Sequence, residues 1–218
     1  MAMILRVVLF APLAAFAVVG AAQQRNINFE LLAAARAGSE TTVRALLDQG
    51  ASPDSRNRLG DTPLNTAARD GNAALVKLLV ERGADVNLPN LARVTPLMSA
   101  AFGGHAEIVK LLLAHKADAK LVDRVRKTAM IYAAGNGNSA CVQALLDAGA
   151  DVNARYANDD TALMWAAAYG QTENVKLLLA RGADPAARDD RGKTALDIAT
   201  EQQQAEVAAL LRAAGAKE

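Results

Sequence analysis

One residue type recurs at a fixed spacing through most of this chain. Each member of the set is a threonine 33 residues after the one before it: Thr62, Thr95, Thr128, Thr161 and Thr194. A glycine series keeps the same step, with Lys116 standing where one member is missing: Gly83, Gly149, Gly182 and Gly215. Self-similarity at a period of about 20 to 50 residues is the signature of stacked repeats. The chain is therefore expected to fold as an array of similar units.

One period has the features of two short helices and a loop. Thr62 is placed to cap a first helix, and Pro63 follows it, where a missing amide donor costs nothing. Gly71 permits a tight turn into a second helix, and Gly83 supplies a left-handed cap before the chain extends into a hairpin. Hydrophobic residues make up 52% of the chain but aromatic ones only 4%, so the core is expected to be Ala, Leu and Val. This composition favours closely packed helices.

These segments resemble the ankyrin repeat. The resemblance is carried by Thr62-Pro63-Leu64, Ala67-Ala68, Gly71, Leu75-Val76-Lys77-Leu78-Leu79 and Gly83-Ala84-Asp85, and it spans about 28–216. It implies an all-α ankyrin-repeat solenoid of stacked helix-turn-helix units with β-hairpin fingers, about six repeats in all, of which the first and last are caps. The expected divisions are a signal peptide (1–22) and a repeat domain (23–218), with repeats at about 28–57, 58–90, 91–123, 124–156, 157–189 and 190–218.

The sequence departs from the ankyrin pattern in three ways. The histidine of the Thr-Pro-Leu-His motif is replaced in every unit, by Asn65, Met98, Ile131, Met164 and Asp197. The apolar members of that set are expected to substitute for the lost hydrogen bonds by packing in the central layers. Lys116 would carry about 1 kcal/mol of strain in a left-handed cap, so its unit is expected to end differently. Gly60 and Gly192 are the glycines expected at the finger tips. The other three fingers have a different residue at this position, so their tips need not be regular. The replacements are Arg93, Arg126 and Asp159.

The N-terminal 22 residues read as an export signal. Arg6 is a basic start, Val7 to Val19 is an apolar run, and Gly20 and Ala22 are small residues before a cut at Gln23. The alternative is an uncleaved membrane anchor, but Pro12 breaks the run, which is shorter than a spanning helix requires. We therefore expect an exported protein, periplasmic or secreted, with no stable membrane insertion after cleavage.

Charge and cysteine content exclude several functions. Removing 1–22 takes away Arg6 alone, leaving 23 basic and 23 acidic residues, so no overall positive field would attract nucleic acid. Cys141 is the only cysteine, so no disulfide within the chain is expected, and it is interpreted as a small buried hydrophobe. His105 and His115 lie at opposite ends of one expected helix and cannot share a site, and His105 occupies a structural position of the repeat. No catalytic motif is present, so an enzyme is not expected, and no cofactor is expected.

A second repeating series is acidic. Its members are Asp85, Asp118, Asp151 and Asp184. A carboxylate ladder for a metal is one interpretation, but these residues belong to the Gly-Ala-Asp segment of the repeat. We expect them to accept backbone hydrogen bonds in the loops, and no metal site is predicted.

The predicted binding residues occupy positions that the repeat leaves free. In ankyrin arrays these positions line a concave groove, where partner specificity is encoded. The expected partner-binding residues are four rings of the first helices together with finger residues: Phe102, Tyr132, Trp165, Tyr169, Arg93, Arg124, Arg126 and Tyr156. Large rings outside the buried repeat positions resemble a binding hot spot. The alternative is that these rings pack only on neighbouring fingers. The basic finger residues suggest an acidic patch on the partner, or simply a solvated face.

The resulting functional hypothesis is a monomeric, non-catalytic module that binds a protein through the groove of repeats three to five. An accessory or inhibitory subunit of an exported enzyme is an alternative. A carrier of a saccharide or another small ligand, using the aromatic cluster, is a third hypothesis. The repeat itself identifies no partner, because a fold does not define a function.

Overall fold

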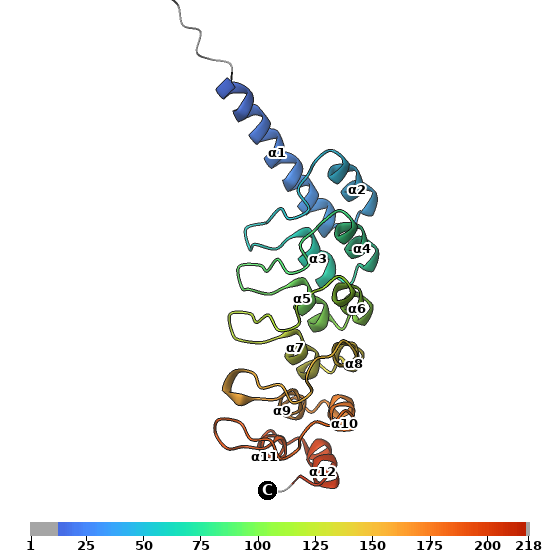
Figure 1. The fold of residues 1–218 in the computed structure, drawn as a ribbon, viewed down its shortest axis with the longest axis vertical. Coiled ribbons are helices and arrows are strands. Elements are labelled where there is room, and N and C mark those ends of the chain that lie inside the picture. Colours follow the sequence, from blue (N-terminus) through green and yellow to red (C-terminus); the bar gives the residue numbers. More distant parts are fainter. Residues whose placement is uncertain (1–12, 217–218) are drawn as a thin grey trace, which may run out of the picture.

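The structure of the chain, a computed structural model, describes residues 13–216. Across these residues twelve α-helices form consecutive pairs and no β-strand is present (Figure 1). The pairs stack into one elongated array, with the first helices in a middle column, the second helices along one side and the connecting loops along the other. The all-α repeat solenoid expected from the sequence is therefore confirmed.

The first helices of the units form one column (Figure 1), and those after the first unit begin beside a capping threonine. These helices are α1 (Leu13–Arg36), α3 (Pro63–Arg69), α5 (Pro96–Gly103), α7 (Ala129–Gly135), α9 (Ala162–Ala168) and α11 (Ala195–Glu201). From α3 onward the hydroxyl of the repeated threonine accepts a hydrogen bond from the backbone N–H three residues later, as between Thr62 and Asn65 at 3.1 Å. Pro63 and Pro96 occupy the first helical position, as predicted.

The second helices share the large buried side chains with the first helices. They are α2 (Glu40–Asp48), α4 (Ala73–Glu81), α6 (Ala106–Ala114), α8 (Ser139–Asp147), α10 (Thr172–Ala180) and α12 (Ala205–Ala213). Leu75, Val76, Leu78 and Leu79 of α4 are all buried, whereas the paired alanines of the first helices let neighbouring units approach closely. Met98, Ile131 and Met164, which replace the motif histidine, are also buried.

Five loops, here called fingers one to five, join successive units. They span 49–62, 82–95, 115–128, 148–161 and 181–194. Each is closed by one backbone bond between residues four apart, as from Asn90 N–H to Val94 O, but the described residues form no strand pairs. The fingers are tight loops and not the β-hairpins expected, because a single closing bond does not make a ladder.

The side chain at one position explains why four fingers are alike and one is not. Asn57, Asn90, Asp123 and Asp189 each accept hydrogen bonds from the backbone N–H groups two and four residues later. Tyr156 occupies this position in the fourth finger and offers no such acceptor there. That finger instead contains the short 3-10 helix η1 (Ala157–Asp159), with left-handed backbone at Asn158 and Asp159.

Two expectations about irregular ends need revision. Lys116 adopts φ of 68°, the same left-handed backbone as the glycines at this position, so the prediction that its unit ends differently is wrong. Arg93 and Arg126, with φ of 62° and 63°, likewise keep the left-handed conformation found at Gly60 and Gly192. The hydrogen bonds that close these loops hold the backbone in this conformation. Lys116, Arg93 and Arg126 therefore carry steric strain that a glycine would not have.

The predicted export signal lies only partly within the described residues. Positions 1–12 fall outside them, and 13–22 form the beginning of α1, which continues through the predicted cut before Gln23. The first part of α1 extends beyond the stack (Figure 1). Within the described part of the chain, no helix combines the length and apolar character needed to cross a membrane.

Candidate functional site

Four aromatic residues from consecutive units lie in one line, here called the aromatic row: Phe102, Tyr132, Trp165 and Tyr169. Phe102 and Tyr132 meet edge to face, with ring centroids 5.7 Å apart and an interplanar angle of 82°. Trp165 and Tyr169 stack, with centroids 5.8 Å apart and an angle of 17°. The structure thus brings together all four rings that were predicted from the first-helix positions.

Lys127 joins the two pairs of rings. Its Nζ lies 4.5 Å from the centroid of the Trp165 ring and 5.5 Å from that of Tyr132, both within range of a cation–π interaction. Lys127 belongs to the third finger, and its backbone N–H donates to Asp123 Oδ1 at 2.8 Å. The finger therefore places a positive charge between rings of α7 and α9.

Tyr132 is tied to the fold more firmly than expected. Its hydroxyl donates a 2.6 Å hydrogen bond to Oδ2 of Asp123, a residue that is itself buried. Burial of the phenol and the bond to the Asp123 carboxylate both raise the pKa of Tyr132 above its ordinary value. Tyr132 is half-buried, so its ring serves the packing of the third finger as well as the row.

The two ends of the aromatic row are open to solvent. Phe102 and Tyr169 each expose 56% of their surface, while Trp165 is half-buried between them. Gly135 of α7 lies close to the Trp165 and Tyr169 rings, at a distance where a Cβ would be in van der Waals contact with both. The binding and packing interpretations each describe part of the row, because the inner rings pack and the outer rings are exposed.

A shallow pocket of about 280 Å³ adjoins the last two rings. Its lining includes Trp165, Tyr169, Asp160, Arg191, Ile198 and Gln202. Burial, reinforced by the nearby carboxylate of Asp189, raises the pKa of Asp160. The pocket therefore combines two aromatic walls with one acidic and one basic side chain, Asp160 and Arg191.

The finger residues predicted to bind do not all lie with the rings. Arg93 and Arg124 are exposed at the tips of the second and third fingers. Arg126 and Tyr156 instead line a separate, larger pocket between the third and fourth fingers. Tyr156 is half-buried and packs against the core, and burial raises its pKa.

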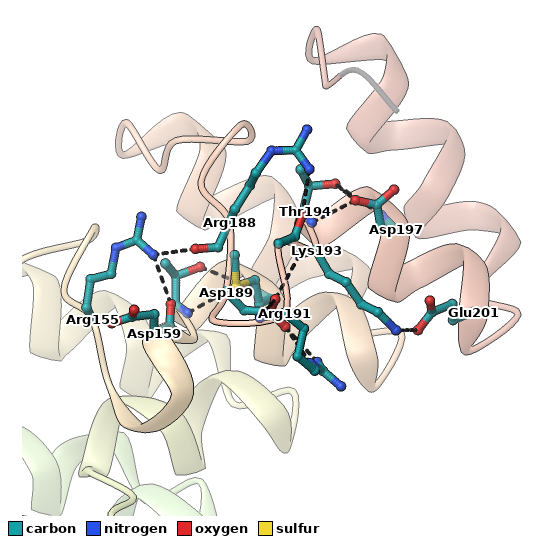
Figure 2. A network of polar contacts seen from close by, with 12 residues as sticks. Arg155, Asp159, Arg188, Asp189, Arg191, Lys193, Thr194, Asp197 and Glu201 are labelled. Carbon is teal, nitrogen blue, oxygen red and sulfur yellow. Dashed lines mark hydrogen bonds and ion pairs between the residues drawn. The ribbon is translucent and has the colours of Figure 1, made fainter.

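The last two fingers are held by a polar network (Figure 2). Arg155 donates to the backbone oxygens of Asp159 and Arg188 and so links the fourth finger to the fifth. Asp189 accepts from Nε and Nη2 of Arg191 at 2.9 and 2.6 Å. Burial opposes ionisation of Asp189, but hydrogen bonds from Lys193 and Arg191 outweigh it and lower the pKa of Asp189. The charges of this region are largely used within the protein.

The remaining reactive side chains have structural positions. A ring nitrogen of His105 lies 3.0 Å from the backbone oxygen of Arg69, joining two units, while His115 contacts the Leu111 oxygen on its own helix. Cys141 is buried, and burial raises the pKa of its thiol to about 11, which disfavours the reactive thiolate. Among residues 13–216, no group of three or more His, Cys, Asp or Glu side chains is placed to hold a metal ion.

The repeating aspartates behave as predicted. Asp85, Asp118, Asp151 and Asp184 each accept a hydrogen bond of 2.8–2.9 Å from the backbone N–H two residues later. Their carboxylates therefore shape the loops.

Sequence reasoning missed the residues that support the row. Lys127, Asp123 and Asp160 are not among the residues predicted from the sequence to bind a partner. A usable signal existed, because Lys127 precedes Tyr132 by five residues, the same interval that separates Asp160 from Trp165. A residue at that interval on a finger lies beside the ring of its own unit.

Together, the paired helices, their threonine caps and the fingers define a protein built of stacked helical repeats. Family models described as ankyrin repeats match residues 21–90 and 88–156, in three-copy form, and 145–199, in many-copy form. These matches cover most of the chain, which therefore belongs to the ankyrin-repeat family. No match to a curated protein was found.

Proposed function

We propose that this chain is a non-catalytic module that binds a protein partner through the aromatic row and the adjacent fingers of repeats three to five. Ankyrin repeats are generally protein-interaction modules and are typically non-catalytic, which supports a binding role. The observation that carries the proposal is the aromatic row itself. Its rings do not occupy the Leu, Val and Ala core positions, and its ends are exposed.

Charge around the row indicates what the partner presents. Arg93 and Arg124 are exposed and take part in no ion pair among the described residues, so an acidic patch would complement them. Near Trp165 the charges are mixed, because Asp160 and Arg191 border the shallow pocket and Lys127 lies over the ring. The partner is therefore expected to offer acidic groups toward the second and third fingers and a flat side chain toward Trp165.

The proposal includes export of a monomeric protein. Its support is the basic Arg6, the apolar run from Val7 to Val19 and the small residues Gly20 and Ala22 before Gln23. The mass of the protein recovered from the exported fraction is expected to be that of a chain beginning at or near Gln23. Recovery of intact chain from Met1 would overturn the cleavage.

Capture from a cell extract tests the binding role. The full chain, a Phe102→Ala variant and a Lys110→Ala variant are immobilised in equal amounts, and the retained proteins are quantified by mass spectrometry. Phe102 is an exposed ring of the row, whereas Lys110 is exposed on the second-helix side at α6. We expect at least one protein retained by the wild type and by Lys110→Ala but depleted on Phe102→Ala. Equal retention by all three would contradict binding at this surface.

A further inference from the structure

A regular set of hydrogen bonds joins one finger to the next. Asp54, Asn87 and Asn153 each accept from the backbone N–H of the repeated aspartate in the following finger, at 2.8–2.9 Å. A second bond joins the tips, from Leu91 N–H to Leu59 O and its equivalents at Arg124 and Asp190. Fingers one to three are thus linked in series, and finger four is linked to finger five.

Both bonds are missing at one place among the described residues, between the third and fourth fingers. Lys120 stands where Asn87 and Asn153 stand in their own fingers, and its side chain has no acceptor atom for the Asp151 N–H. At the tips, no bond joins Ala157 N–H to Val125 O. The changed turn that follows Tyr156 alters the tip of the fourth finger. Two departures from the repeat therefore coincide at a single junction.

A pocket of about 730 Å³ opens at this junction, here called the seam pocket. Its apolar floor and wall are formed by residues from both sides of the junction: Leu113, Val122, Met130, Leu145 and Tyr156. Met130 and Leu145 are buried, and Tyr156 is half-buried. The volume falls within the range of about 300–1,000 Å³ that is typical of small-molecule sites. None of its lining residues belongs to the aromatic row.

The rim of the seam pocket carries unequal charge. Asp118 and Asp151 each direct one carboxylate oxygen to a backbone N–H of their own loop. Arg155 is held by backbone oxygens of the fourth and fifth fingers (Figure 2). Lys120 and Arg126 are exposed, and within the described residues neither forms an ion pair. Three basic side chains, Lys120, Arg126 and Arg155, stand against two acidic ones at this rim, so its net charge is +1, and the two basic side chains without an ion pair are the ones open to a ligand.

We propose that the seam pocket binds a small amphipathic carboxylate. The apolar body of the ligand lies against Met130, Leu145 and Tyr156, where its burial from water supplies the binding energy. Its carboxylate meets Lys120 and Arg126 at the rim, and the Arg126 guanidinium suits a paired contact with two carboxylate oxygens. The seam pocket shares the third and fourth fingers with the protein-binding surface proposed above but includes no ring of the aromatic row, so variants of the row and variants of the pocket test the two proposals separately.

Calorimetric titration of the full chain with decanoate tests this proposal, with decyltrimethylammonium as a probe of similar apolar body and opposite charge. We expect one decanoate per chain, bound at least about tenfold more tightly than the cationic probe. Arg126→Gln removes one rim charge at an exposed position and is expected to weaken decanoate binding at least about fivefold. Equal affinity for the two probes, or no saturable binding of decanoate, would overturn the proposal.

Variants that exchange the finger-linking residue separate the seam pocket from its neighbours. Lys120→Asn restores the side chain found at the equivalent positions 87 and 153, so it should join the fingers, remove a rim charge and weaken decanoate binding at least about fivefold. The corresponding exchange at the first junction, Asp54→Lys, whose bond partner Asp85 lies outside the pocket lining, and Trp165→Ala, in the aromatic row, should each leave the affinity within about twofold. Decanoate affinity that falls with Trp165→Ala but not with Lys120→Asn would place binding on the aromatic row and refute the seam pocket.

Discussion

At the scale of single residues, Tyr132 combines two roles that the sequence presents as alternatives. Its ring belongs to the aromatic row, and its hydroxyl bonds a buried carboxylate of the third finger. Truncating the whole side chain would therefore disturb the surface and the fold together. The position of the Tyr132 ring could be predicted from the repeat period. Its bond to Asp123 could not, because the path of a loop depends on the hydrogen bonds within that loop.

Removing only the hydroxyl separates these roles. Tyr132→Phe leaves the Asp123 carboxylate buried with one donor fewer and is expected to lower the free energy of unfolding by about 1.5 to 3 kcal/mol, the range for hydrogen bonds to charged groups. Urea denaturation followed by circular dichroism measures this change. Tyr169→Phe is the matched control, because Tyr169 is 56% exposed, and it should change stability by less than about 0.5 kcal/mol. Similar losses in both variants would show that the Asp123 bond contributes nothing.

At the scale of elements, the repeat period predicted the helices well and the fingers less well. Threonine caps, helix-one prolines and buried Leu and Val all follow from local chemistry that recurs every 33 residues, and the structure contains each of them. The fingers depend on a few polar contacts between loops. Substitutions such as Lys120 or Tyr156 are visible in the sequence, but whether the neighbouring loop adjusts to them depends on packing.

Lys116 gives a test of strain at a helix end. It occupies a left-handed cap with φ of 68°, where glycine has no steric penalty. Lys116→Gly is therefore expected to raise the free energy of unfolding by about 1 kcal/mol, and the reverse exchange Gly83→Lys to lower it by a similar amount. Gly83 is a suitable partner because a side chain built there would meet nothing within 4 Å, so only its φ of 84° opposes the change. Chemical denaturation of both variants measures the two changes in the free energy of unfolding. A Lys116→Gly protein that is less stable than the wild type would contradict the claim that Lys116 is strained.

At the scale of the whole molecule, folding and binding use different residues of the same units. The main helix contacts lie within a unit or between neighbouring units, so one continuous core of Leu, Val, Ala, Ile and Met runs along the array. The aromatic row crosses three of these units outside the Leu, Val and Ala core positions, and Tyr132 is the ring of the row that is also bonded to the fold through Asp123. This division explains how one repeat pattern can specify the fold while leaving positions free for a partner.

The most direct test of the central claim compares Trp165→Ala with Leu178→Ala in the affinity for a captured partner and in stability. Trp165→Ala is expected to weaken binding by about 2 kcal/mol or more, roughly 30-fold, while lowering the free energy of unfolding less than Leu178→Ala does, because Trp165 is only half-buried. Leu178 is fully buried, so Leu178→Ala should cost about 2 to 5 kcal/mol of stability while leaving affinity per folded molecule unchanged. If Trp165→Ala instead destabilises the fold as much as Leu178→Ala and binding per folded molecule is unaltered, the ring belongs to the core and the aromatic row is not the binding surface.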